Sequence, residues 1–263
     1  MSDATKVLWV NPIGSSGYDD PMGEVMGAIK APTTQIDVVS LSTPYLPHHL
    51  EYRAYSALII GDMVRLARWA DQQGYHSMVI GCFYDPGLED AREISGSTVV
   101  VAPCQAAVQI AGNIANRFSV IIGQEKWAVQ MRERVAAYGY SDRLASMRSI
   151  DIGVPDLQKD CDYTASQIME AGRRAIEEDK AEALILGCTC SFGMHEVVQK
   201  ELGIPVIDPI IAAFKMAEFL GGLQSQLDLK PSRLWSCAPP PEAEMAEYAL
   251  FEQPAPIGNK VTY

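Results

Sequence analysis

The sequence predicts an α/β fold made of two similar halves. Short runs of β-branched and apolar residues alternate with longer segments of helical period, which is typical of helices that cover parallel sheets. In addition, a strand followed by a Gly-Cys turn occurs twice, 106 residues apart, at Gly81-Cys82 and Gly187-Cys188. The simplest explanation of the second observation is a duplicated α/β unit.

Seven runs have the composition of strands that are buried on both faces of a parallel sheet. They lie at residues 6–10, 35–39, 78–80, 98–101, 119–122, 183–186 and 204–207. Four intervening segments have apolar residues at three- and four-residue spacing and predict helices, at residues 57–73, 125–138, 163–178 and 210–220. The last part, around residues 254–259, is rich in Pro, Gly and Asn and predicts an irregular tail.

The repeat extends beyond the two Gly-Cys turns. The same offset aligns residues 100–103 with 206–209, and it aligns the two Ala-Ala pairs that follow them. We therefore expect two pseudo-symmetric domains, one of residues 1–104 plus 214–263 and one of residues 105–213. The carboxyl ends of parallel strands are where ligands bind in such sheets, so the active site is expected in the cleft between the domains.

Composition and charge restrict the classes of function. The 263 residues are 48% apolar and 21% charged, as in ordinary globular proteins, and the net charge is −12. A surface this acidic repels nucleic-acid backbones and anionic lipid heads, so we expect a small-molecule substrate and neither nucleic acid nor a membrane as partner. No apolar run has the length of a membrane span and no signal peptide is evident, which predicts a cytoplasmic protein.

Two of the six cysteines stand where chemistry is expected. Cys82 follows a predicted strand, and Asp85-Pro86 can cap the next helix, whose N-terminus would lower the pKa of the thiol. Cys188 follows the equivalent strand and is succeeded by the hydroxyl residues Thr189 and Ser191. Each cysteine alone could be a small buried apolar residue. As a pair they suit proton transfer at carbon, in which one thiolate removes a proton and the opposed thiol delivers one.

Four motifs, in this order and spacing, resemble the aspartate/glutamate/hydantoin racemase superfamily, and most of all its hydantoin and allantoin racemase branch. They are Asn11-Pro12, the Gly-Cys-Phe-Tyr-Asp-Pro-Gly-Leu stretch at 81–88, the Leu-Gly-Cys stretch at 186–188 and the Ile-Pro-Val-Ile-Asp-Pro stretch at 204–209. The resemblance implies a pseudo-symmetric two-domain fold, a homo-oligomer and deprotonation beside a carbonyl group without a cofactor. It also implies that Cys82 and Cys188 are the two acid/base thiols.

The same resemblance implies a set of substrate-binding residues that hold the substrate's oxygen atoms: Asn11, Ser15, Ser16, Phe83, Thr189 and Cys190. Asn11 could instead be a turn residue before Pro12, and the two serines could be helix caps. The chain departs from the family pattern at three places, which bear on the substrate more than on the fold. These are Ile13, the Pro-Cys-Gln-Ala-Ala stretch at 103–107 and Thr189-Cys190.

The remaining candidates have weaker support. Cys190 and Cys104 could pack in the core or line the pocket, and the His48-His49 loop could be a lid or an exposed loop. His195 is expected to face solvent, whereas Asp85 and Asp208 are expected to support the thiols. Asp208, which precedes Pro209, could instead simply start a helix. Cys-x-Cys without a second paired motif is weak support for zinc, so no metal site is predicted. Phosphate-loop and Ser-hydrolase motifs are not found.

The sequence thus predicts a cofactor-independent racemase or epimerase that acts on a hydantoin-like or amino-acid-derived compound. Three alternatives stay open: a decarboxylase on the same fold, which needs one thiol, a cis–trans isomerase with a nucleophilic thiol, and a binding protein without catalysis.

Overall fold

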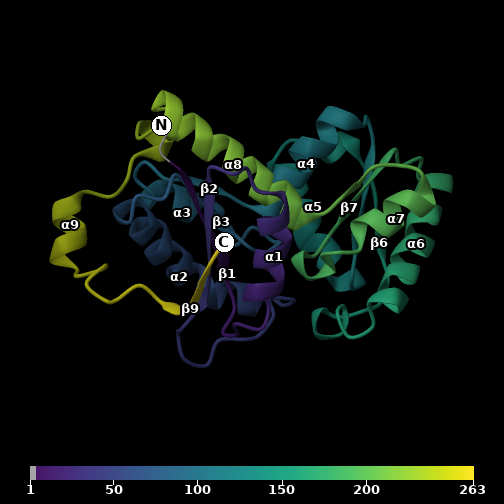
Figure 1. The fold of residues 1–263 in the computed structure, drawn as a ribbon, viewed down its shortest axis with the longest axis horizontal. Helices are drawn as coiled ribbons and strands as arrows, with labels where there is room; N and C mark the ends of the chain where they lie inside the picture. Colours follow the sequence, from purple (N-terminus) through teal and green to yellow (C-terminus); the bar gives the residue numbers. More distant parts are fainter. Residues whose placement is uncertain (1–3) are drawn as a thin grey trace. The chain divides into compact units, whose positions relative to one another are not determined.

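The computed structural model describes residues 4–263, which form two compact units (Figure 1). Among the described residues, the first unit comprises residues 4–80 together with Pro86–Val101 and Phe214–Tyr263. The second unit comprises Gly81–Asp85 and Ala102–Ala213. The short segment that contains Cys82 therefore belongs to the second unit, although the strand before it belongs to the first.

The first unit is built on a five-stranded sheet in the order β4-β3-β1-β2-β9. The strands are β1 (Thr5–Asn11), β2 (Thr34–Leu41), β3 (Ser77–Ile80), β4 (Val99–Val101) and β9 (Ile257–Thr262). The first four are parallel, and β9 adds to β2 in the antiparallel direction. Apolar residues on both faces of β1, such as Leu8 and Trp9, are completely buried, as expected for a central strand covered by helices.

The helices of this unit follow from their apolar stripes. In α2, buried residues such as Ile59, Met63 and Leu66 recur at three- and four-residue spacing and pack on the sheet side. The helical elements are α1 (Asp19–Ile29), α2 (Arg53–Gln72), α3 (Leu88–Ile94), the 3₁₀ turn η5 (Trp235–Cys237) and α9 (Glu242–Glu247). The long helix α8 (Pro209–Leu227) begins in the second unit and ends in the first.

The second unit has a four-stranded parallel sheet in the order β6-β5-β7-β8. Its strands are β5 (Phe118–Ile122), β6 (Leu144–Ser149), β7 (Ala183–Leu186) and β8 (Val206–Ile207). Its helices are α4 (Pro103–Ile114), α5 (Ala128–Ala137), α6 (Cys161–Glu177) and α7 (His195–Leu202), with the 3₁₀ turns η1 (Glu125–Trp127), η2 (Ser141–Arg143), η3 (Val154–Asp156) and η4 (Thr189–Ser191). Ile168 of α6, Leu184 of β7 and Val198 of α7 share one apolar cluster.

The predicted α/β fold class is confirmed, and all seven predicted strands are present. The two sheets also share one strand order, because β4-β3-β1-β2 in the first unit corresponds to β8-β7-β5-β6 in the second. The offset of 106 residues carries β3 onto β7, and it carries the start of α4 onto the start of α8. The repeat seen in the sequence therefore coincides with a repeat of topology.

The predicted irregular tail is wrong over its second half, where Ile257–Thr262 forms β9. Its residues alternate between partly buried and exposed, so the segment has no apolar run. Its contacts with β2 are polar instead: Thr262 Oγ1 donates to Asp37 Oδ1 (2.6 Å), and Lys260 Nζ lies 2.9 Å from Asp37 Oδ2. Such a strand is specified by its partner, which a local pattern does not reveal.

Candidate functional site

Cys82 lies in a tight turn directly after β3. The thiol-bearing residue is half-buried, and its neighbours Gly81 and Phe83 are buried. The backbone N–H of Asp85 donates to the carbonyl of Cys82 (2.9 Å), which closes the turn. The first predicted thiol is therefore held by a short, well-bonded loop rather than by a regular element.

Cys188 lies in the equivalent turn after β7. Gly187 donates its N–H to Ile121 O of the neighbouring strand β5 (2.7 Å), and a Cβ at Gly187 would lie only 2.8 Å from the same oxygen. Only glycine therefore fits between the two strands at this point. Cys188 itself precedes η4, and the Cys190 N–H donates to its Sγ (3.4 Å).

A side-chain hydrogen bond joins the two turns within the second unit. The Thr189 hydroxyl donates to the carbonyl of Gly81 (3.2 Å), and both residues are buried. The residue before Cys82 and the residue after Cys188 are therefore in direct contact, although they are 108 positions apart. The structure brings Cys82, Phe83, Cys188 and Thr189 into one region of this unit.

The electrostatic surroundings favour the protonated form of the Cys82 thiol. Burial is the largest effect and raises the pKa of Cys82 to about 12, together with the nearby Cys188 thiol and Asp85 carboxyl and against the backbone N–H of Tyr84, which lowers it. The expectation that a helix N-terminus lowers the pKa of this thiol is therefore wrong. The contribution of Cys188 means that the two sulfur atoms interact. Ionisation of one thiol therefore disfavours ionisation of the other.

Asp85 does not have the predicted role as the cap of the next helix. That helix, α3, starts at Leu88 after Gly87, which has the left-handed φ of 68°. Asp85 is completely buried, and its carboxylate accepts hydrogen bonds from the backbone N–H groups of Cys104 and Gln105 at the start of α4 (2.9 Å each). Within the second unit, Asp85 therefore caps α4 and not the helix that follows it in the sequence.

Asp208 begins α8, as one of the two interpretations of its sequence position predicts. Its Oδ1 accepts from the N–H groups of Ile210 (2.8 Å) and Ile211 (3.2 Å). The other oxygen lies 3.6 Å from His195 Nδ1, too far for a hydrogen bond but close enough to raise the pKa of the imidazole. The expectation that His195 simply faces solvent is therefore wrong, because it is partly buried against this carboxylate.

The other residues predicted to bind substrate have structural partners of their own. In the second unit, Cys190 is buried and its carbonyl accepts from Gln158 Nε2 (2.7 Å). In the first unit, Asn11 is buried, its amide donates to Asp19 (2.6 Å), and its oxygen accepts from Trp9 Nε1 (2.8 Å). Ser15 is partly exposed and Ser16 is exposed, beside α1. Their roles toward substrate stay predictions.

Among the remaining cysteines, Cys104 is buried at the start of α4, and Cys161 and Cys237 are exposed. His48 is exposed, while His49 packs its ring on Tyr55. Within residues 4–263, no group of three or more His, Cys, Asp and Glu side chains is arranged to hold a metal ion. No helix in the same range is long and apolar enough to cross a membrane.

A buried polar group that the sequence does not predict is the indole of Trp127 at the end of η1. The ring is 2% exposed and packs over Gly123, directly after β5, yet its Nε1 has no hydrogen-bond partner among the described residues. Buried donors are rarely left unpaired, and this one follows the strand that neighbours β7. A tryptophan in a segment of helical period is predicted to be a core residue, so no local pattern distinguished Trp127 from an ordinary core residue.

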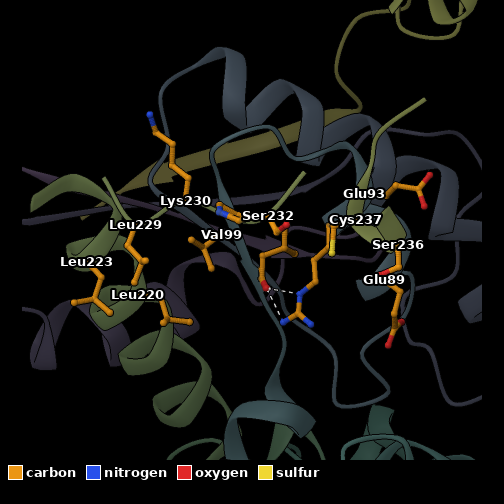
Figure 2. A pocket seen from close by; sticks show the side chains of 13 residues that line it. Glu89, Glu93, Val99, Leu220, Leu223, Leu229, Lys230, Ser232, Ser236 and Cys237 are labelled. Atoms are coloured by element: carbon orange, nitrogen blue, oxygen red, sulfur yellow. Dashed lines mark hydrogen bonds between the residues drawn. The ribbon is translucent and has the colours of Figure 1, made fainter. Parts of the chain in front are cut away.

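A cavity of about 430 Å³ lies in the first unit and is unrelated to the cysteine turns (Figure 2). Val99, Leu220, Leu223 and Leu229 form its apolar wall, while Lys230, Ser232, Ser236 and Cys237 come from the segment between α8 and α9. Arg92 reaches across it to the carbonyl of Val100. The cavity holds none of the residues that the sequence analysis selected.

Comparison with known proteins places these features in a family context. The model of the family described as Asp/Glu/Hydantoin racemase matches residues 7–217. A hydantoin racemase from Rhizobium meliloti is 38% identical over 185 residues, which is 70% of this chain and 76% of the relative. Another, from Pseudomonas sp. (strain NS671), is 32% identical over 191 residues, 73% of this chain and 76% of the relative.

A solved structure gives the same result for the fold. The allantoin racemase from Klebsiella pneumoniae superposes with a TM-score of 0.83 at 28% sequence identity, and the match covers 91% of this chain and 95% of the other. Both cysteine turns lie inside the range of the family match, whereas α9 and β9 lie beyond it.

Proposed function

The protein belongs to the Asp/Glu/hydantoin racemase family, and from that premise we propose that it inverts a stereocentre next to a carbonyl group, with Cys82 and Cys188 as the acid/base pair. Membership of this family, with racemases as relatives, makes the protein an isomerase of the racemase type. The two-thiol mechanism and the class of substrate are the content of the proposal.

The observation that carries the proposal is the Thr189–Gly81 hydrogen bond, which joins the two cysteine turns. The effect of the Cys188 thiol on the pKa of Cys82 supports it. Inversion at carbon needs a base on one face of the substrate and an acid on the other. Two thiols in which ionisation of one disfavours ionisation of the other supply that combination.

In the proposed reaction, the thiolate of one cysteine takes the proton from the stereogenic carbon, and the C–H electron pair moves onto the carbonyl oxygen. The thiol of the other cysteine then gives its proton to the opposite face, and the electron pair returns to carbon. The first cysteine ends as a thiol and the second as a thiolate, so the opposite enantiomer reacts in the reverse sense. Only protons move, so the reaction needs no redox cofactor.

For the substrate, we propose a small compound with an acidic C–H between a carbonyl group and a nitrogen, either a hydantoin-like ring or an amino-acid derivative. The hydantoin and allantoin racemases among its relatives support this class. The negative charge that develops on the carbonyl oxygen requires hydrogen-bond donors that are already in place. Donors of this kind are proposed around Thr189 and the residues that follow Cys82.

The test is polarimetry of the purified enzyme on 5-substituted hydantoins, allantoin and free amino acids. Loss of optical rotation is expected on at least one substrate, and Cys82→Ala and Cys188→Ala are each expected to slow it about 10²–10⁴-fold, the usual size of an acid/base contribution. Cys161→Ala, which removes an exposed thiol of the same unit, serves as the control and should react at the wild-type rate.

Other outcomes identify the alternatives. Release of CO₂ from a carboxylated substrate would indicate a decarboxylase, and isomerisation of a double bond would indicate a cis–trans isomerase. Binding without turnover would indicate a binding protein. Racemisation at the wild-type rate by both Cys82→Ala and Cys188→Ala would contradict the proposal directly.

A further inference from the structure

The proposed reaction does not use Asp85, a completely buried carboxyl of the second unit. Asp85 is the third residue after Cys82, and its N–H donates to the Cys82 carbonyl (2.9 Å). Its φ of 48° lies in the left-handed region, which is unfavourable for a residue with a side chain. A conformation of this kind persists only where surrounding contacts hold it.

The contacts that hold Asp85 come from two other elements. One carboxylate oxygen, Oδ1, accepts from the Cys104 N–H, and the other, Oδ2, accepts from the Gln105 N–H (2.9 Å each). The Tyr138 hydroxyl, at the end of α5, donates to Oδ2 (2.7 Å). One buried carboxylate therefore connects the Cys82 turn to the first turn of α4 and to the end of α5.

The start of α4 explains why this connection is strong. The first N–H groups of any helix lack partners within the helix, and a side-chain oxygen at the N-cap normally accepts from them. The N-cap of α4 is Ala102, which has no such oxygen. Asp85 supplies the missing acceptor from a distant segment, so the order of the Cys82 turn and the capping of α4 depend on the same carboxylate.

Several charged and titratable groups face this carboxylate. Cys82 lies on the same loop, Cys104 on α4, Arg134 on α5 and Tyr138 at the C-cap of α5. Burial raises the pKa of Asp85 to about 7, whereas the hydrogen bonds of Cys104, Tyr138 and Gln105 and the charge of Arg134 lower it. An ionised Asp85 in turn raises the pKa of the Cys82 thiol.

We propose that Asp85 and Tyr138 are positioning residues that hold the Cys82 turn against α4 and α5 and so fix the direction of the thiol. This inference rests on the proposed role of Cys82 as an acid/base group. Neither side chain needs to touch the substrate: Asp85 acts through the backbone of the turn, and Tyr138 acts through Asp85.

Two substitutions and two measurements test the inference. Asp85→Asn keeps the shape but removes the charge, and Tyr138→Phe removes only the hydroxyl. Tyr140→Phe is the matched control, because Tyr140 lies two residues further on and packs its ring near Phe118. The first measurement is kcat and KM for racemisation. The second is the rate of iodoacetamide alkylation of Cys82 and Cys188 against pH, resolved by peptide mass spectrometry.

Misplacement of a reacting group by about 1 Å can cost about 100-fold in rate, so both variants are expected to lower kcat about 10- to 100-fold with KM within about 2-fold. At a fixed pH near 8, Asp85→Asn should also raise alkylation of Cys82 about 3- to 10-fold, because removal of the carboxylate charge lowers the pKa of the thiol. The alkylation rate of Cys188 should change less than 2-fold. Faster alkylation of Cys82 combined with a lower kcat for racemisation is not expected from a general loss of structure.

The inference is overturned if both variants fold and keep the wild-type kcat, or if Tyr140→Phe lowers kcat as much as Tyr138→Phe does. If Asp85→Asn does not fold, Tyr138→Phe decides alone. If wild-type enzyme racemises no substrate, the proposed function fails. The alkylation profiles of Cys82 then still decide this inference, because alkylation needs no substrate: a shift confined to Cys82 supports it and an unchanged profile overturns it.

Discussion

At the carboxyl of Asp85, burial and hydrogen bonding act on the protonation equilibrium in opposite directions. Burial away from water dominates and raises the pKa to about 7, although two backbone N–H groups and a phenol hydroxyl stabilise the charged form. The carboxyl therefore changes charge near neutral pH inside the protein. In the unfolded chain it ionises near its ordinary pKa of 3.8.

This difference predicts a pH dependence of the free energy of unfolding. Between pH about 4 and 7 the folded state keeps a proton on Asp85 that the unfolded state has lost, so the contribution of Asp85 to stability falls as the pH rises through this window. Relative to Asp85→Asn, the wild type should lose about 1 kcal/mol per pH unit there and nothing further above pH about 8. Urea unfolding of both proteins from pH 4 to 9 measures this difference in the free energy of unfolding. If the free energies of the two proteins changed in parallel with pH, the shifted pKa of Asp85 would be contradicted.

Individual residues of the site were predictable to different degrees. The two Gly-Cys turns could be predicted because the repeat places them at equivalent strand ends, and the sequence alone shows a cysteine at each of these positions. The partners of Asp85 could not be found, since Cys104 and Tyr138 contact it through tertiary folding from 19 and 53 residues away. The same holds for the ion pair of His195 with Asp208. The roles of Asn11, Ser15 and Ser16 stay predictions.

At the scale of the element, the turn after β7 depends on a glycine. Replacement of Gly187 by Ala would place Cβ 2.8 Å from Ile121 O and 2.9 Å from Val120 Cγ1, so β5 and β7 would have to separate beside Cys188. We expect Gly187→Ala to destabilise the protein by about 1–3 kcal/mol and to lower racemisation.

The same substitution in open space is the control. Gly61 lies on the exposed face of α2, where a Cβ meets only Arg65 at 3.7 Å. Because alanine is the better helix former, Gly61→Ala should stabilise by about 0.5–1 kcal/mol. Thermal unfolding of the two variants compares them, and equal effects would contradict the tight packing at Gly187.

The added strand β9 is held by a buried carboxylate of its neighbour. Asp37 on β2 is 2% exposed and accepts hydrogen bonds from Thr262 and from the Tyr75 hydroxyl, with Lys260 beside it. These donors lower the pKa of Asp37 against the effect of burial, which is the largest and raises it. The edge strand thus supplies two of the groups that stabilise a charge inside the sheet.

Removal of one of those groups should weaken the first unit. Lys260→Met leaves the buried carboxylate without its cation and is expected to lower the free energy of unfolding by about 1–3 kcal/mol. Lys230→Met is the control, because the partner of Lys230, Asp228, is exposed. This variant should change the free energy of unfolding by less than about 1 kcal/mol. Urea midpoints at pH 7 distinguish them, and equal midpoint shifts for the two variants would show that β9 does not depend on this contact.

The strands with an apolar run were predictable, and two edge strands were not. Both β6 and β9 lie at sheet edges, are largely half-exposed and carry charged residues such as Arg148 and Lys260. Arg148 donates hydrogen bonds to Asp179, which lies 31 residues away in the sequence. Their extended conformation follows from pairing with β5 and β2, which no local periodicity records.

At the scale of the whole molecule, two sheets with the same strand order account for the repeat that the sequence displays. A duplicated unit places a Gly-Cys turn after corresponding strands. A reaction that exchanges protons with both faces of one carbon needs two acid/base groups, and two such turns supply them. The division into domains at residues 104/105 and 213/214, the cytoplasmic location and a homo-oligomer stay predictions, because each depends on properties that local patterns do not encode.

The central claim is that Cys82 and Cys188 exchange protons with opposite faces of one substrate carbon. The most direct measurement is hydrogen–deuterium exchange at that carbon in heavy water, followed by NMR on each pure enantiomer with wild type, Cys82→Ser and Cys188→Ser. Wild type should exchange both enantiomers, and product of inverted configuration should carry deuterium from its formation. Each variant keeps one thiol as base, so each should exchange a different enantiomer without inversion. Exchange of the same single enantiomer by both variants, or of neither, would contradict the two-thiol account.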